Sequence, residues 1–299
     1  MRPITYLLPF FDKLISERAK KISERLILRV AIASYILHLI LIALANFGFI
    51  PMENKFFSNP ISAIYTPFSF ILLYEVYLLI FYLPKSISYY IGKQYEIITL
   101  IVIRRIFKDI GQLKLSSNWF NITSDLQFTY DVLTSLILFI LIYWFYKITQ
   151  NVIIQGQSSP VEKEDRIHQF IRLKKSISVI LVPLLLFLAS YSLISWVFAS
   201  ISDYLNGINA FKNINNIFFD EFFTVLIVVD VLLLLASFFY TDQFYKIFRN
   251  SGFVISTILI KISFSVDGLV NNALIIGAVL FGLSVLYIHN LYEKNLAAK

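Results

Sequence analysis

Long apolar segments recur along the whole chain, and they constrain its fold more than any other feature. Residues 220–240, for example, read DEFFTVLIVVDVLLLLASFFY. A helix of about 20 apolar residues crosses about 30 Å of hydrocarbon. Of all residues, 58% are hydrophobic and only 15% are charged, whereas a soluble domain is about half apolar and about a quarter charged. We therefore predict an all-α, polytopic membrane protein.

Eight segments are apolar enough to be predicted as membrane crossings. They cover residues 30–50, 62–84, 94–113, 129–148, 176–200, 220–240, 252–268 and 270–290. The basic character of residues 1–29 and 147–175 supports this number, because segments rich in lysine and arginine stay in the cytoplasm. Two cytoplasmic segments need an even number of crossings between them. The prediction therefore has both termini in the cytoplasm and places the protein in the plasma (cytoplasmic) membrane.

The third and seventh segments carry charges, and they leave an alternative open. If residues 94–113 and 252–268 lay flat at the membrane surface, six crossings would remain and the basic stretch 163–175 would face the outside. The distribution of basic residues counts against this, because 19 of the 26 Lys and Arg residues fall on the predicted cytoplasmic side. The other seven are Lys55, Lys114 and Lys212 outside, and Arg104, Arg105, Lys108 and Lys261 within the membrane.

The two halves of the chain follow the same order of segments, which predicts an internal repeat. The predicted parts are an amphipathic lead-in helix (1–29), a first four-helix repeat (30–148), a basic linker (149–175), a second four-helix repeat (176–292) and a tail (293–299). Four helices followed by four give parallel repeats, a layout of transporters that bind their substrate where the repeats meet. Chance similarity between two membrane sequences of low complexity is the alternative.

Each half places one acid and one base in consecutive apolar segments. Glu75 is followed by Arg104 and Arg105, and Asp230 is followed by Lys261. Counted from the predicted cytoplasmic ends, each of these acids and its first base lie nine or ten residues deep, or about 14–15 Å. We therefore expect two acid–base pairs near the middle of the membrane, Glu75 with Arg104 and Asp230 with Lys261.

A charge inside hydrocarbon is costly and commonly belongs to an ion or proton path. The pairs therefore favour a protein that conducts or transports an ion, a cation or proton above all, through a channel-like pathway. A buried salt bridge that only fixes helix packing is the other interpretation. Asp131, Asp220 and Glu221 lie near the predicted outer ends of their segments, where they would form a vestibule that attracts cations. Ordinary solvated loop charges would fit the same pattern.

Other kinds of chemistry find no support in the chain. It has no cysteine, its three histidines lack metal-ligand spacing, and no phosphate loop, dinucleotide fingerprint or nucleic-acid motif is present. We expect neither enzymatic activity nor a cofactor. The expected partners are the lipid bilayer, the transported ion and further copies of the same chain in a homo-oligomer. A non-conducting or sensory subunit that assembles with another membrane protein is the alternative function.

Overall fold

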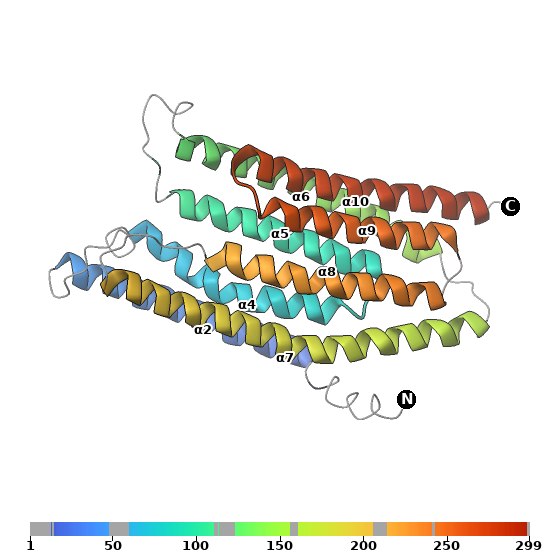
Figure 1. The fold of residues 1–299 in the computed structure, drawn as a ribbon, viewed down its shortest axis with the longest axis horizontal. Helices are drawn as coiled ribbons and strands as arrows, with labels where there is room; N and C mark the ends of the chain where they lie inside the picture. Colours follow the sequence, from blue (N-terminus) through green and yellow to red (C-terminus); the bar gives the residue numbers. More distant parts are fainter. Residues whose placement is uncertain are drawn as a thin grey trace.

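The structure, a computed structural model, is all-α in the residues that it describes, which are 13, 15–47, 60–110, 113, 123–155, 161–205, 214–240 and 243–297. These residues form eight long α-helices and one short 3₁₀ helix (Figure 1). The elements are α2 (Glu17–Asn46), η2 (Pro60–Ile64), α4 (Tyr65–Tyr82), α5 (Ile87–Ile110), α6 (Thr123–Gln155), α7 (Val161–Leu205), α8 (Ile214–Tyr240), α9 (Phe244–Ser263) and α10 (Gly268–Ala297).

Each predicted apolar segment overlaps one of the long helices, but several helices extend beyond it. α6 has 33 residues and α7 has 45, so at about 1.5 Å per residue both are much longer than the roughly 30 Å of hydrocarbon. The ends of these two helices form most of the predicted linker 149–175, and residues 156–160 lie outside the described residues. Residues 17–29 of the predicted lead-in continue into α2 without a break.

Four helices have the length and apolar composition of membrane spans. They are Glu17–Asn46, Asp125–Thr149, Glu221–Tyr240 and Gly268–Leu296. Large apolar side chains on their outer faces are exposed, among them Phe139 at 73% and Phe239 at 83%. A monomeric soluble protein rarely exposes apolar surface of this extent, whereas a lipid bilayer suits it. The fold is therefore that of a multi-pass membrane protein.

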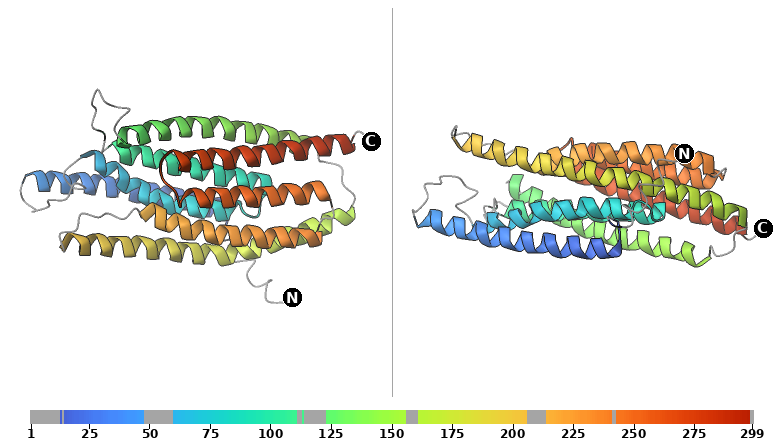
Figure 2. Two further views of the ribbon diagram at one scale, coloured as in Figure 1. Left: turned by 45° about the horizontal axis from the view of Figure 1, so that its top comes forward. Right: turned by 90° about the horizontal axis from the view of Figure 1, so that it is seen from below.

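The helices are arranged in two layers that correspond to the two halves of the chain. α2, α4, α5 and α6 lie side by side in one layer, and α7, α8, α9 and α10 lie side by side in the other (Figure 2, right). Consecutive helices run in opposite directions. Across the layers α6 packs against α10, α4 packs against α7, and α5 touches both α9 and α10. α5 therefore lies in the middle of the interface between the two halves.

The two ends of the bundle differ in their turns and in their charge. We call the basic end the one that holds the α4–α5 turn (residues 83–86) and the start of α9. Lys85, Lys93, Lys174, Lys246 and Arg249 lie near it. The opposite end holds the α9–α10 turn, residues 264–267. Gly268 follows this turn with a φ of 71°, a conformation that glycine adopts without steric cost, and so allows the short reversal between the two helices.

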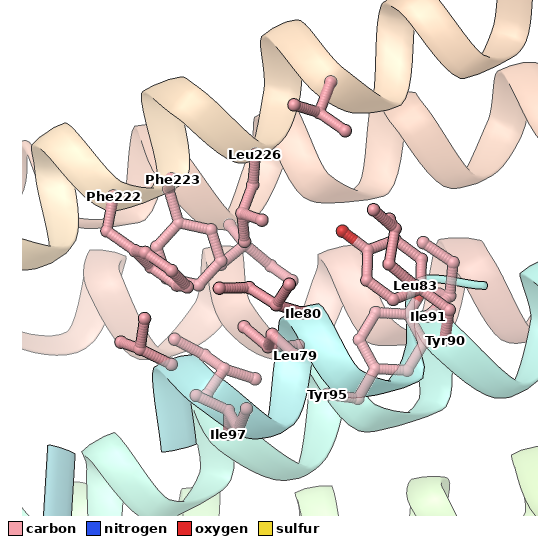
Figure 3. Close-up of a cluster of buried hydrophobic side chains, with 14 of the residues drawn as sticks. Leu79, Ile80, Leu83, Tyr90, Ile91, Tyr95, Ile97, Phe222, Phe223 and Leu226 are labelled. Atoms are coloured by element: carbon pink, nitrogen blue, oxygen red, sulfur yellow. The ribbon is translucent and has the colours of Figure 1, made fainter. Parts of the chain in front are cut away.

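The buried core lies between the two layers and fixes α4, α5 and α8 relative to one another. Figure 3 shows Leu79 and Ile80 of α4 against Phe223 and Leu226 of α8, and all four side chains are at most 1% exposed. Tyr95 of α5 is also fully buried. Its hydroxyl lies 2.8 Å from the Ser256 hydroxyl of α9, which in turn donates to the carbonyl of Ala278. Tyr95 therefore donates the bond that ties α5 to the second half.

Candidate functional site

α5 carries several of the polar side chains that reach into the bundle. Gln94, Tyr95, Thr99 and Arg104 are each at most 4% exposed. Buried polar groups need hydrogen-bond partners because their desolvation is otherwise uncompensated. Thr99 donates to the Tyr95 carbonyl of its own helix. The partners of Gln94, Tyr95 and Arg104 lie on other helices, so α5 connects polar groups of the two halves.

Glu75 of α4 and Arg104 of α5 form a buried ion pair. Arg104 Nη2 donates to Glu75 Oε2 at 2.5 Å, and the two residues are 2% and 3% exposed. Arg104 Nε also donates to the carbonyl of Leu100 at 3.4 Å. The structure thus brings together the first acid and base that their positions along the chain suggested. This pair is buried, and each charge offsets the other.

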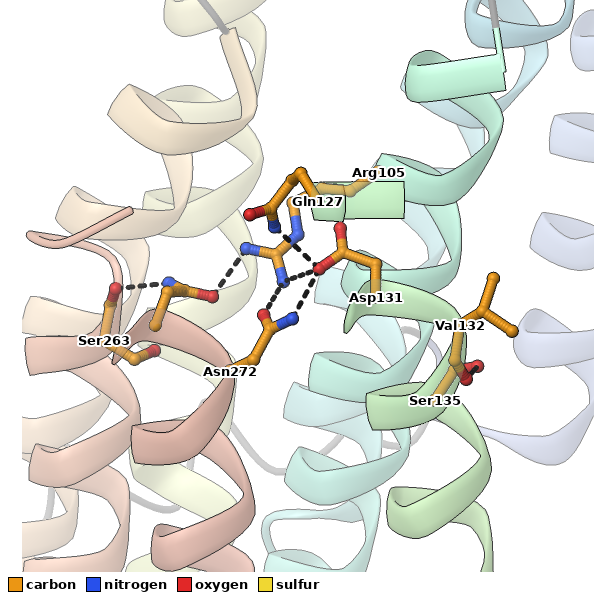
Figure 4. Close-up of polar contacts among 8 residues, drawn as sticks. Arg105, Gln127, Asp131, Val132, Ser135, Ser263 and Asn272 are labelled. Atoms are coloured by element: carbon orange, nitrogen blue, oxygen red, sulfur yellow. Dashed lines mark hydrogen bonds and ion pairs between the residues drawn. The ribbon is translucent and has the colours of Figure 1, made fainter. Parts of the chain in front are cut away.

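Arg105 is the centre of a second polar cluster, which joins three helices (Figure 4). Its guanidinium donates to Asp131 Oδ1 of α6 at 3.1 Å. It also donates to the side-chain oxygens of Asn271 and Asn272 of α10 at 2.6 and 2.7 Å. The amide of Asn272 and that of Gln127 both donate to the same Asp131 oxygen, at 2.7 and 2.9 Å. The Arg105 cluster therefore holds α5, α6 and α10 together.

The position of Asp131 corrects the predicted outer vestibule. This carboxylate is fully buried at 0% exposed and is bound to Arg105, so it does not line an open mouth. The physical reason is the length of α6, which begins at Thr123 and not at residue 129. Asp131 therefore lies more than two turns inside the helix. Of the other two predicted acids, Glu221 is exposed on α8, and the side chain of Asp220 lies outside the described residues.

Asp230 of α8 is buried, and neutral groups provide its hydrogen bonds. It is 6% exposed and accepts a hydrogen bond from Gln94 Nε2 of α5 at 3.2 Å. The oxygen of the same Gln94 amide accepts from the Thr257 hydroxyl of α9 at 2.9 Å. The carboxylate is thus tied to both halves of the protein by an amide and a hydroxyl.

The groups that surround Asp230 in the described part of the chain are Gln94, Tyr90, Thr257 and Lys174, and not the predicted partner Lys261. Thr257, which lies beside Asp230, is four residues before Lys261, so Lys261 lies one turn, or about 6 Å, farther along α9. Lys261 falls in the last turn of this helix, where a cation interacts favourably with the helix dipole. The prediction failed because it took α9 to begin at residue 252, whereas the helix begins at Phe244.

The cation that lies near Asp230 is Lys174 of α7, a residue that the sequence assigned to the cytoplasmic linker. Lys174 is 3% exposed, and its ammonium donates to the carbonyl of Lys85 in the α4–α5 turn at 3.0 Å. Lys174 and Asp230 line one small cavity with Tyr90 and Asn250. The cavity has about 20 Å³ of space for the centres of water molecules. It lies where α5, α7, α8 and α9 meet, close to the basic end.

Sequence reasoning missed Gln94, Lys174 and the Asn271–Asn272 pair. One signal for Gln94 was available, because it precedes Arg105 by 11 residues, which is close to three helical turns. Both side chains therefore lie on one face of α5, the face that contacts the second half. Lys174 had no such signal, since its burial depends on the packing of the α4–α5 turn against α7.

Within the described residues, no three or more acidic or histidine side chains are close enough together to hold a metal ion. The different surroundings of the buried acids Glu75 and Asp230 are the main chemical feature of the site. A comparison of the chain with protein-family models, with curated protein sequences and with solved structures found no match.

Proposed function

We propose that this protein transports a cation or proton across the membrane and that Asp230 is the group that binds the ion. The single observation that carries the proposal is the contrast between the buried acids Glu75 and Asp230. Glu75 has an arginine at 2.5 Å, whereas Asp230 accepts its hydrogen bond from a neutral amide. A buried carboxylate without a direct ion pair is costly unless an exchangeable ion neutralises it.

Eight membrane crossings are part of this proposal. α5 and α9 run alongside the long apolar helices, and the two arginines of α5 are bound to acids of α4 and α6. A helix whose charges are neutralised inside the bundle can cross a membrane, so α5 does not need to lie flat at the surface, and we propose that α9 crosses beside it. With the basic end in the cytoplasm, both α2 and α10 have their basic ends on that side.

The arrangement of Asp230 between the halves also supports transport. The two layers repeat the same order of four helices, and we propose that they are parallel repeats. Asp230 of the second layer is bound to Gln94 of the first. In transporters built from such repeats, the substrate site lies where they meet, and rocking of one repeat against the other exposes it to each side in turn.

The test is ion flux into liposomes that contain the purified protein. We expect flux driven by a cation or pH gradient, and we expect Asp230→Asn to reduce it to the level of empty liposomes, because the amide has the same shape but cannot ionise. Asp267→Asn is the matched control, since Asp267 is exposed in the α9–α10 turn and should leave flux unchanged. Absence of flux under every gradient would contradict the proposal and favour a non-conducting subunit.

A further inference from the structure

The charged groups of Lys174 and Asp230 share a cavity without touching. They do not form a direct ion pair in the described structure, and each is hydrogen-bonded elsewhere, Lys174 to the Lys85 carbonyl and Asp230 to Gln94. Their charges nevertheless interact. Two buried opposite charges that line one cavity without direct contact leave a gap that a small polar molecule can bridge.

The gap has room for a water molecule, and although most of its wall is apolar, Lys174 and Asp230 contribute polar groups to it. A single water needs about 10–15 Å³ of space for its centre and two to four polar partners, and the cavity provides about 20 Å³. Tyr90 adds a third polar group to Lys174 and Asp230. It is 2% exposed, and its hydroxyl interacts with Asp230 yet makes no hydrogen bond of normal geometry. That hydroxyl is available to a water in the cavity.

The charges around the cavity disfavour a metal cation. Lys174 of α7 already provides a positive charge beside Asp230, and Arg249 of α9 is close enough to repel the charge of Lys174. Among the described residues, Tyr90 of α5 is a further titratable group that faces Asp230. A sodium or potassium ion would have to bind against two positive charges. A proton moved from Lys174 to Asp230 neutralises both groups, which lowers their desolvation cost.

We propose that the transported ion is a proton and that Lys174 delivers it to Asp230 through one bridging water. This inference rests on the proposed function. In the step, an N–H bond of the Lys174 ammonium breaks and the proton passes to the water, which gives one of its own protons to the Asp230 carboxylate. Lys174 is left as a neutral amine, Asp230 as a neutral acid, and the water is regenerated. Lys174 then regains a proton from solvent at the basic end.

The test compares two substitutions of Lys174 in a proton-flux measurement with a pH-sensitive dye inside the liposomes. Lys174→Met removes the proton and the charge. Lys174→Arg keeps the charge and the hydrogen-bond donors, but arginine does not release its proton in proteins. We expect both variants to slow proton flux at least about tenfold, in line with the loss of a proton-transfer group. Lys147→Met, an exposed lysine of α6, is the matched control and should transport at the normal rate.

The outcomes separate the inference from the proposed function. If Lys174→Arg restores normal flux while Lys174→Met does not, Lys174 acts only as a fixed charge and the relay is wrong. If the protein moves sodium or potassium without protons, and Asp230→Asn stops this movement, the proposed function stands and the proton inference fails. Size-exclusion chromatography and thermal unfolding of each variant identify a loss of flux that is caused by misfolding.

Discussion

At the scale of single residues, the environment of each buried charge decides what it can do. Glu75 and Arg104 neutralise each other at 2.5 Å, and Asp131 is neutralised by Arg105. Asp230 differs because its direct partner is an amide. Glu75 and Asp131 are therefore neutralised by arginines, whereas Asp230 is the acid that we propose exchanges an ion.

The Glu75–Arg104 pair leads to a stability prediction. Glu75→Gln leaves the Arg104 charge buried without its partner, and Arg104→Met does the same to Glu75, so each should lower the free energy of unfolding by about 3–5 kcal/mol. The double variant leaves no lone charge and should be more stable than either single variant. Thermal unfolding in detergent measures how much each single variant and the double variant differ in stability from the original protein. Additive losses would show that the two side chains do not act as a pair.

At the scale of the helices, close packing between neighbours depends on a few small residues. Gly252 of α9 faces Val285 of α10, and a Cβ placed at Gly252 would lie 2.7 Å from both methyl groups of that valine. Valine is stiff at χ1, so the methyl groups cannot move away easily. Small residues of this kind let membrane helices approach closely.

This contact predicts the effect of two alanine substitutions. Gly252→Ala should push α9 from α10 and destabilise the protein by about 1–3 kcal/mol, as overpacking does. Gly277→Ala of α10 is the control, because a Cβ there meets nothing within 4 Å and alanine favours the helix. Thermal unfolding should therefore show a lower midpoint for the first variant only. Equal midpoints would mean that the two helices are not packed as closely as described.

At the scale of the whole molecule, the proposed topology depends on α5 and α9 crossing the membrane. The chain has no cysteine, so single cysteines can be introduced as labels for each side. Gln169 of α7 is exposed near the basic end, and Ser265 is exposed in the turn at the opposite end. We expect an impermeant thiol reagent applied to intact cells to label Ser265→Cys but not Gln169→Cys, and to label both in opened membranes. In the six-crossing alternative the stretch 163–175 faces outside, so labelling of both from one side would favour it.

The sequence by itself determined the class of the protein and the order of its helices. In hydrocarbon a chain must satisfy its backbone hydrogen bonds internally, so long apolar segments such as 220–240 predict helices without knowledge of their neighbours. The contact between Glu75 and Arg104 could also be predicted from the sequence, because a short turn joins their helices and makes them adjacent.

Only the tertiary structure decided which groups surround Asp131 and Asp230. Their partners, Arg105 with Asn272 and Gln94 with Thr257, include side chains from helices far apart in the sequence. Such contacts depend on which faces of non-consecutive helices fit together, and close packing of side chains sets this fit. The same packing buried Lys174 beside the α4–α5 turn. It also formed the cavity that Lys174 shares with Asp230.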